Sequence, residues 1–331
     1  MPDLSQFLTN QLPTLVVAVI GVPVVIGLYI VGLEFLVRRL PDAVQPRARP
    51  WIWVGPALVF VTVFLVIPLI STIWISLQDK HGTAFVGLSN YLAVLSDPAV
   101  LLTIRNNLYW LVLYTFFTLL FGVMMAVLAD RVPYETPVKS LIFMPMAISF
   151  VAMSVIWKFM YSYQPPGATQ TGTLNFLLTS LLHIDPITWI QDQRFNNFAL
   201  IAVAIWGWVG FAMVILSAAL KGIPGDLLEA ARVDGAGEIT IFRRVIFPLL
   251  MPTVTVVATT LIIFALKAFD IVYVMTAGNF DTNILAVKMY QEYFVSADPG
   301  RSGAIAVILL VAVIPVLVFN LRQFRAQEAR R

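Results

Sequence analysis

Long apolar stretches recur along almost the whole chain, and they constrain its fold more than any other feature. A helix needs about 20 mostly apolar residues to cross the hydrocarbon core of a bilayer. Seven stretches meet this requirement, at roughly 12–37, 53–77, 107–129, 141–160, 198–220, 253–275 and 303–321. Only 12% of the 331 residues are charged, whereas soluble domains have about 25%. The sequence therefore predicts an all-α polytopic membrane protein with about seven transmembrane helices.

Basic residues gather in every second loop between the predicted spans. The loops after the first, third and fifth spans and the C-terminal tail together hold 14 lysines and arginines, whereas the alternate loops hold five. Cytoplasmic loops are the ones enriched in these residues. We therefore predict that the N-terminus lies outside the cell, that the C-terminus is cytoplasmic, and that the loop at 222–252 is cytoplasmic.

The residues that soluble catalysis requires are scarce. The chain has no cysteine, which excludes disulfides and thiolate metal sites, and its two histidines, His81 and His183, are too few to form a zinc site. A phosphate-binding loop needs the pattern GxxxxGK[ST], and the sequence does not contain it. We expect a protein that is not an enzyme and that binds neither a metal ion nor a cofactor itself.

The loop at 222–252 contains a polar, charged helix-turn-helix pattern between two apolar spans. Pro224 ends the preceding span, and a short helix follows with the letters EAARV. Gly235 and Gly237 permit a tight turn, and a second amphipathic stretch continues to Pro248. The short helix is too weakly apolar to bind lipid well. Its small alanine face favours docking into the groove of another protein.

This pattern resembles the EAA loop of ABC importer permeases. The residues in register with that loop are Glu229, Ala230, Ala231, Gly235 and Pro248. Val245 and Phe247 stand where the loop usually has isoleucine and leucine. The Asp234-Gly235-Ala236 triplet is similar to the carbohydrate-uptake branch, in particular to the larger permease subunit of maltose transporters. Within this branch, Trp157-Lys158-Phe159, the stretch 164–167 and Leu174-Asn175 resemble alpha-glucoside permeases.

The resemblance implies a domain organisation. It implies a type I ABC importer permease core of six helices plus one N-terminal helix. Residues 1–50 would be a transmembrane anchor and linker, residues 51–325 the transmembrane domain with its EAA loop at 222–252, and residues 326–331 a cytoplasmic tail. The residues implied to couple transport to an ATPase are Glu229, Ala230, Ala231, Asp234, Gly235 and Pro248.

The resemblance also implies partners. This chain would pair with a second permease subunit, two ATP-binding cassette subunits and an extracytoplasmic sugar-binding protein, in the inner membrane and without nucleic acid. ATP and Mg²⁺ would be bound by the ATPase subunits, and this chain would hold no cofactor and no metal.

Polar groups within the spans are candidates for the substrate path, because such groups are costly in lipid. Lys267 and Asp270 are three residues apart, so on one helix they share a face and could form an ion pair, either structural or in the path. Trp206 and Trp208 could stack on a sugar ring, but they point to different faces of one helix. Ala204, Leu261 and Ala265 stand where the maltose permease is polar, so none of its sugar contacts is carried over.

Three functions remain open from the sequence. The favoured one is a permease subunit of a binding-protein-dependent, ATP-driven importer of an alpha-glucoside or a maltose- or trehalose-like oligosaccharide. An ion-gradient-driven secondary transporter with Asp270 and Lys267 in its path is the alternative, and it leaves the EAA pattern unexplained. A membrane scaffold without transport activity is the third.

Overall fold

The computed structural model describes residues 14, 17–42 and 44–328, and those residues form helices and connecting loops. In this described part the only β-pairing is an isolated antiparallel bridge between Gln78 and Phe85. The chain divides into two compact units, Met1–Ser71 and Thr72–Arg331.

The first unit consists of apolar helices with almost no buried side chains. Its elements are η1 (Val17–Gly21), α2 (Val22–Arg38), α3 (Gln45–Val61), η2 (Thr62–Val66) and the start of α4 (Ile67–Ser76). Two helices long enough to cross a membrane result, Val19–Arg38 and Gln45–Ser76. Of the predicted first span at 12–37, residues 12, 13, 15 and 16 lie outside the described part. Glu34 accepts hydrogen bonds from Arg38, at 3.2 Å, and from Arg49.

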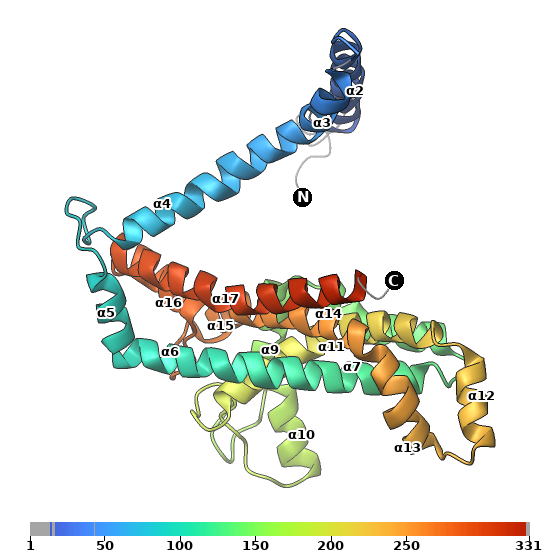
Figure 1. Cartoon of the computed structure of the whole chain (residues 1–331). Helices are drawn as coiled ribbons and strands as arrows, with labels where there is room; N and C mark the ends of the chain where they lie inside the picture. The colour runs from blue at the N-terminus through green and yellow to red at the C-terminus, as the bar shows by residue number, and fades with distance from the viewer. Residues whose placement is uncertain (1–13, 15–16, 43, 329–331) are drawn as a thin grey trace. The chain divides into compact units, whose positions relative to one another are not determined.

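The second unit contains the remaining elements, and Figure 1 shows their arrangement. They are α5 (Ser89–Ser96), α6 (Pro98–Tyr109), η3 (Trp110–Tyr114), α7 (Thr115–Ala129), α8 (Glu135–Phe143), η4 (Met144–Ala147), α9 (Phe150–Met160), α10 (Thr173–Leu181), α11 (Asn196–Lys221), α12 (Gly225–Val233), α13 (Glu238–Ile241), η5 (Phe242–Ile246), α14 (Phe247–Leu266), α15 (Asp270–Thr276), α16 (Leu285–Phe294) and α17 (Pro299–Glu328).

The number of spans agrees with the sequence except in the fourth. The described residues contain six helices able to cross a membrane, or seven if the bent pair Glu135–Ala147 and Phe150–Met160 counts as one span. The two halves of this pair meet at 99°, so the span predicted at 141–160 is broken. Ile148 and Ser149 are extended, and the Ser149 hydroxyl accepts a hydrogen bond from the Ala152 amide at 3.2 Å. This serine cap starts a new helix instead of continuing the old one.

The core of the second unit forms around α11, which packs against α7, α8 and α14. Leu200, Met213 and Leu216 of α11 are fully buried. Small residues allow the close approach: a Cβ on Gly122 would lie 2.6 Å from the Ala212 Cβ, and a Cβ on Gly210 would lie 2.6 Å from the Ile142 carbonyl oxygen. Interfaces between membrane helices are enriched in small residues for this reason.

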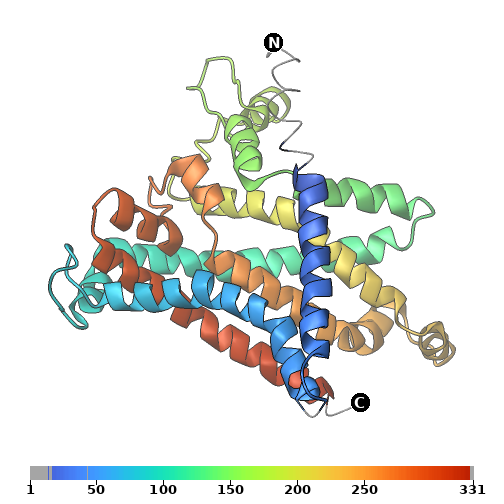
Figure 2. The same cartoon turned by 90° about the horizontal axis from the view of Figure 1, so that it is seen from above.

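The helices of the second unit have two distinct ends. In Figures 1 and 2, α12 and α13 lie at one end of the bundle, and α15 and α16 lie toward the other. Near the α12 end, Lys139 of α8 contacts Asp130 and Ser217, and the Ser217 hydroxyl donates to the Asp130 carboxylate at 2.8 Å. This polar cluster joins α7, α8 and the last turns of α11, directly before α12 begins.

The packing of α11 predicts a large effect of one added methyl group. Gly210→Ala should destabilise the protein by about 1–3 kcal/mol, because the new Cβ meets the backbone of Ile142 and Phe143. Thermal unfolding of the purified protein in detergent would measure the loss. Gly55→Ala is the matched control, since nothing lies within 4 Å of its added Cβ, and it should be neutral or slightly stabilising. Equal melting temperatures for both variants would contradict this account of the packing.

Candidate functional site

The helix that carries the EAA pattern, α12, is mostly exposed, and only Leu228 and Ala231 are half-buried. None of its residues is buried, and Glu229 and Ala230 face solvent. Apolar side chains are exposed here too: Val233 at the end of α12 is 88% exposed, and Ile239 in α13 is 77% exposed. Apolar groups this exposed next to charged ones, at a helix end that leads away from the bundle, are typical of a surface that another protein covers.

The turn after α12 has a defined geometry. Gly235 has a φ of 79°. Its amide donates to the Arg232 carbonyl at 3.0 Å, and the Ala236 amide donates to the Ala231 carbonyl at 3.0 Å. This pair of bonds is the Schellman arrangement, in which glycine ends a helix in the left-handed conformation. Gly237, by contrast, has an ordinary φ of −73°. The predicted tight turn is confirmed, and only one of its two glycines requires left-handed backbone.

Ion pairs connect this turn to the rest of the unit. Glu238 accepts hydrogen bonds from Arg232 at 3.1 Å and from Arg131, at the end of α7, at 3.2 Å. All three side chains are more than half exposed, so each pair contributes little to stability. They do give α12 a preferred direction relative to α13.

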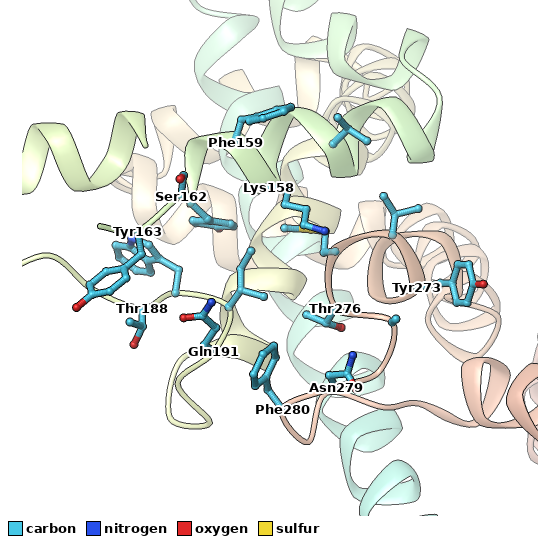
Figure 3. Close-up of a pocket in the computed structure, with 17 residues that line it drawn as sticks. Lys158, Phe159, Ser162, Tyr163, Thr188, Gln191, Tyr273, Thr276, Asn279 and Phe280 are labelled. Carbon is cyan, nitrogen blue, oxygen red and sulfur yellow. The ribbon is translucent and has the colours of Figure 1, made fainter. Parts of the chain in front are cut away.

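A second candidate site is a pocket of about 770 Å³ at the opposite end of α11, which we call the end pocket. It lies between the end of α9, the loop at 188–191, and α15 with the loop that follows it (Figure 3). Its lining residues are Val155, Lys158, Phe159, Tyr161, Ser162, Tyr163, Thr188, Trp189, Ile190, Gln191, Tyr273, Val274, Met275, Thr276, Ala277, Asn279 and Phe280. The 26 residues of α11 put this end roughly 39 Å from the start of α12.

One wall of the end pocket is a strained loop that follows α15. Ala277, Phe280 and Asp281 have φ values of 52°, 58° and 61°, which are rare for residues other than glycine. Two buried asparagines hold this loop. The Asn106 amide donates to the carbonyls of Asp281 and Asn283 at 2.7 and 2.8 Å, and the Asn196 amide donates to the Phe280 carbonyl at 2.6 Å. Strained backbone persists where surrounding contacts over-determine it, and such places cluster at functional sites.

The aromatic wall of the end pocket is also held in place. The Tyr161 hydroxyl donates to the Ala199 carbonyl at 3.1 Å, and burial raises the pKa of this phenol. The Trp189 indole donates to the Asn175 side chain at 3.1 Å. Asn175 is itself fully buried and makes further bonds to Ser162 and Ile187.

The two tryptophans predicted for the substrate path lie apart from the end pocket. Trp206 packs against Trp157, with ring centroids 5.6 Å apart, whereas Trp208 packs against Phe264 at 4.8 Å and against Phe150 at 6.3 Å. They therefore face different neighbours, as their spacing indicates. Their role in a substrate path stays a prediction.

Lys267 and Asp270 do not share one helix face, as their spacing in the sequence had suggested they could. The helix breaks between them: α14 ends at Leu266, and α15 begins at Asp270. Among the described ion pairs, none joins these two side chains. The spacing rule assumed one continuous helix, and the break removes the shared face.

Sequence reasoning did not find the end pocket. Its polar side chains come from three segments that are far apart in the chain, Lys158 from α9, Gln191 from a loop, and Asn279 from the turn after α15. No spacing within one segment could have grouped them. The one available signal was the Trp157-Lys158-Phe159 string, which stood out for its resemblance rather than for its chemistry.

Comparison with known proteins adds a family and a fold. Residues 118–330 match the model of a family described as binding-protein-dependent transport system inner membrane component. An osmoprotective compounds uptake permease protein, GgtC of Synechocystis sp., is 50% identical over 279 residues, which are 84% of this chain and 100% of the relative. The alpha-glucoside transport system permease protein AglF of Rhizobium meliloti is 44% identical over 275 residues, 83% of this chain and 82% of the relative.

A solved structure supports the fold independently of close sequence similarity. A chain in the crystal structure of a bacterial alginate ABC transporter, in complex with an alginate pentasaccharide-bound periplasmic protein, superposes with a TM-score of 0.74. The match covers 85% of this chain and 96% of that chain at 20% identity. The polytopic all-α fold predicted from the apolar stretches is therefore that of an ABC importer permease.

The anchoring of the strained loop predicts a local change in dynamics. Asn196→Ala removes the side chain that bonds the Phe280 carbonyl, so the amides around 277–285 should exchange with solvent about twofold to twelvefold faster, because one net hydrogen bond contributes about 0.5–1.5 kcal/mol. Hydrogen exchange measured by mass spectrometry would report this. Asn279→Ala is the control, since its side chain makes no hydrogen bond among the described residues. Unchanged exchange in Asn196→Ala would show that the loop holds its shape unaided.

Proposed function

We propose that this chain, which belongs to the family of binding-protein-dependent transport system inner membrane components, is the permease subunit of an ATP-driven ABC importer that carries a sugar. Such a component is a translocation subunit and not itself a catalyst. The observation that carries the proposal is α12, an exposed helix with the EAA pattern that ends in a left-handed glycine, outside the packed bundle.

The exposed helix supports a role in energy coupling. The six coupling candidates are each exposed or half-buried: Glu229, Ala230 and Ala231 lie on α12, Asp234 and Gly235 in the turn that follows it, and Pro248 in the first turn of α14. An ATPase subunit that seats α12 would cover its apolar side chains. Because α12 follows α11 with only three intervening residues, a displacement of α12 acts on the most buried helix of the bundle. Packed helices have discrete arrangements, so such a displacement can switch one arrangement for another.

The relatives favour a sugar as cargo. The permease from Rhizobium meliloti is named for alpha-glucosides, and a permease protein from Thermococcus litoralis, 29% identical over 281 residues, is named for trehalose and maltose. An alpha-glucoside or a maltose- or trehalose-like oligosaccharide is the cargo we propose. Trp206, Trp208, Lys267 and Asp270 remain candidates for contacts along the path.

The proposal includes an orientation and partners. The distribution of lysine and arginine supports a cytoplasmic α12 and C-terminus and an extracytoplasmic N-terminus and end pocket. A second permease subunit, two ATPase subunits and an external sugar-binding protein would complete the transporter. ATP and Mg²⁺ would belong to the ATPase subunits.

A charge reversal on α12 tests the coupling role. Glu229→Lys should abolish ATP-dependent uptake of labelled maltose, trehalose or sucrose by cells, at least about tenfold, because it reverses the charge of the surface that the ATPase would contact. The amount of permease in the membrane should not change, since Glu229 makes no described contact. Lys80→Met, which alters a charge at a remote exposed loop, should transport normally. Full uptake by Glu229→Lys would disprove the coupling role.

The two glycines of the turn offer a matched pair. Neither has an atom within 4 Å of an added Cβ, so only backbone conformation distinguishes them. Gly235→Ala should reduce copurification of the ATPase subunits and uptake, because alanine at a φ of 79° costs about 1–2 kcal/mol and the end of α12 would shift. Gly237→Ala, at a φ of −73°, should behave as the wild type. The same result for both variants would show that the turn geometry is irrelevant to coupling.

A further inference from the structure

The end pocket is lined by polar and aromatic side chains that have no part in the proposed coupling to an ATPase. We propose that it is an initial binding site for the sugar, in which Lys158, Gln191 and Asn279 donate hydrogen bonds to sugar hydroxyl groups before the sugar passes between the helices. This inference rests on the proposed function and on the proposed extracytoplasmic location of the end pocket. It assigns to this chain the binding of the sugar before translocation.

The polar side chains around the pocket have unused hydrogen-bonding capacity. Five of the lining side chains make no hydrogen bond or ion pair to any described residue, and they are Lys158, Tyr163, Thr188, Gln191 and Asn279. In Figure 3, Lys158 extends from α9 toward the loop that carries Thr276 and Asn279, and Gln191 lies on a third wall. Lysine supplies three donors, and each amide supplies two donors and an acceptor.

Three asparagines near the pocket, unlike Gln191 and Asn279, use their side-chain amides in hydrogen bonds within the protein. They are Asn106, Asn175 and Asn196, which are fully buried. The side-chain amide of each donates hydrogen bonds to backbone carbonyls of segments that form the pocket. Structural amides thus build the walls, whereas the amides of Gln191 and Asn279 remain available. In a preorganised binding site, the supporting polar groups are hydrogen-bonded within the protein, and the groups that contact the ligand are held ready by them.

The size and lining of the pocket suit a sugar. Its volume of about 770 Å³ lies within the range of roughly 300–1,000 Å³ that small-molecule sites occupy. Sugars present C–H faces as well as hydroxyls, and the fixed rings of Tyr161 and Trp189 offer apolar faces for them. None of the lining residues is acidic, so Lys158 has no anionic competitor in the wall.

The strained loop lowers the cost of binding. Its left-handed residues and its anchors from Asn106 and Asn196 hold Asn279 and Phe280 in one conformation before a ligand arrives. A binding group that is already ordered loses less conformational entropy when it contacts its ligand.

The test uses the whole transporter. The permease, its ATPase subunits and a saturating amount of the loaded binding protein are placed in proteoliposomes with labelled maltose, trehalose or sucrose, whichever the wild type carries. The measured quantity is sugar moved per ATP hydrolysed. Gln191→Ala combined with Asn279→Ala should lower this ratio about threefold to tenfold, and Lys158→Met should lower it similarly, while ATP hydrolysis stimulated by the binding protein stays unchanged.

Controls and contrary outcomes separate the explanations. Lys80→Met and Ser180→Ala alter exposed side chains outside the pocket and should leave the ratio at the wild-type value. A wild-type ratio in the pocket variants would overturn the proposal. A parallel fall in stimulated ATP hydrolysis, with the ratio intact, would overturn it too, because the pocket would then be a docking surface for the binding protein. A wild-type complex that moves none of these sugars on ATP would overturn the proposed function and this site with it.

Discussion

The close packing of α11 against α7 and α8 is the contact on which the rest of this molecule depends. It is possible only because Gly122 and Gly210 leave no Cβ where the neighbouring helices approach. The same helix carries Asn196 at its first turn and leads into α12 after its last. One buried helix thus connects the loop that shapes the end pocket with the exposed helix that resembles a coupling element. A helix packed on several sides transmits a displacement rather than absorbing it.

The two ends of α11 differ in how they are stabilised. At the pocket end, buried asparagines hold strained backbone, and the resulting wall has one conformation. At the other end, α12 has no buried residue and is held by exposed ion pairs through Glu238. Exposed pairs are weak, so these bonds alone restrain α12 only weakly. This contrast fits the proposal of a binding pocket at one end and a coupling helix at the other.

Two departures from the sequence-based expectations have the same physical origin. Hydropathy measures whether a segment can enter a membrane, but it does not report helix continuity. The fourth span breaks at Ser149, and the sixth breaks between Leu266 and Asp270, although both segments are apolar enough to be predicted as single spans. The shared helix face that would let Lys267 and Asp270 pair is absent for this reason. Local capping and tertiary contacts decide where a helix ends. The sequence of one segment does not contain its tertiary contacts.

The sequence by itself determined the membrane class, the approximate spans and the EAA pattern from Glu229 to Pro248, because hydropathy and turn chemistry act over short distances along the chain. It also indicated that Gly235 lies in a turn, which the structure shows as left-handed backbone. Only the tertiary structure decided that Lys158, Gln191 and Asn279 surround one pocket. Those residues come from segments separated by up to about a third of the chain, and the buried asparagines that bring them together act through backbone carbonyls. Every residue has a backbone carbonyl, so hydrogen bonds to carbonyls do not require particular residue types at the accepting positions. These contacts therefore produce no recognisable sequence motif.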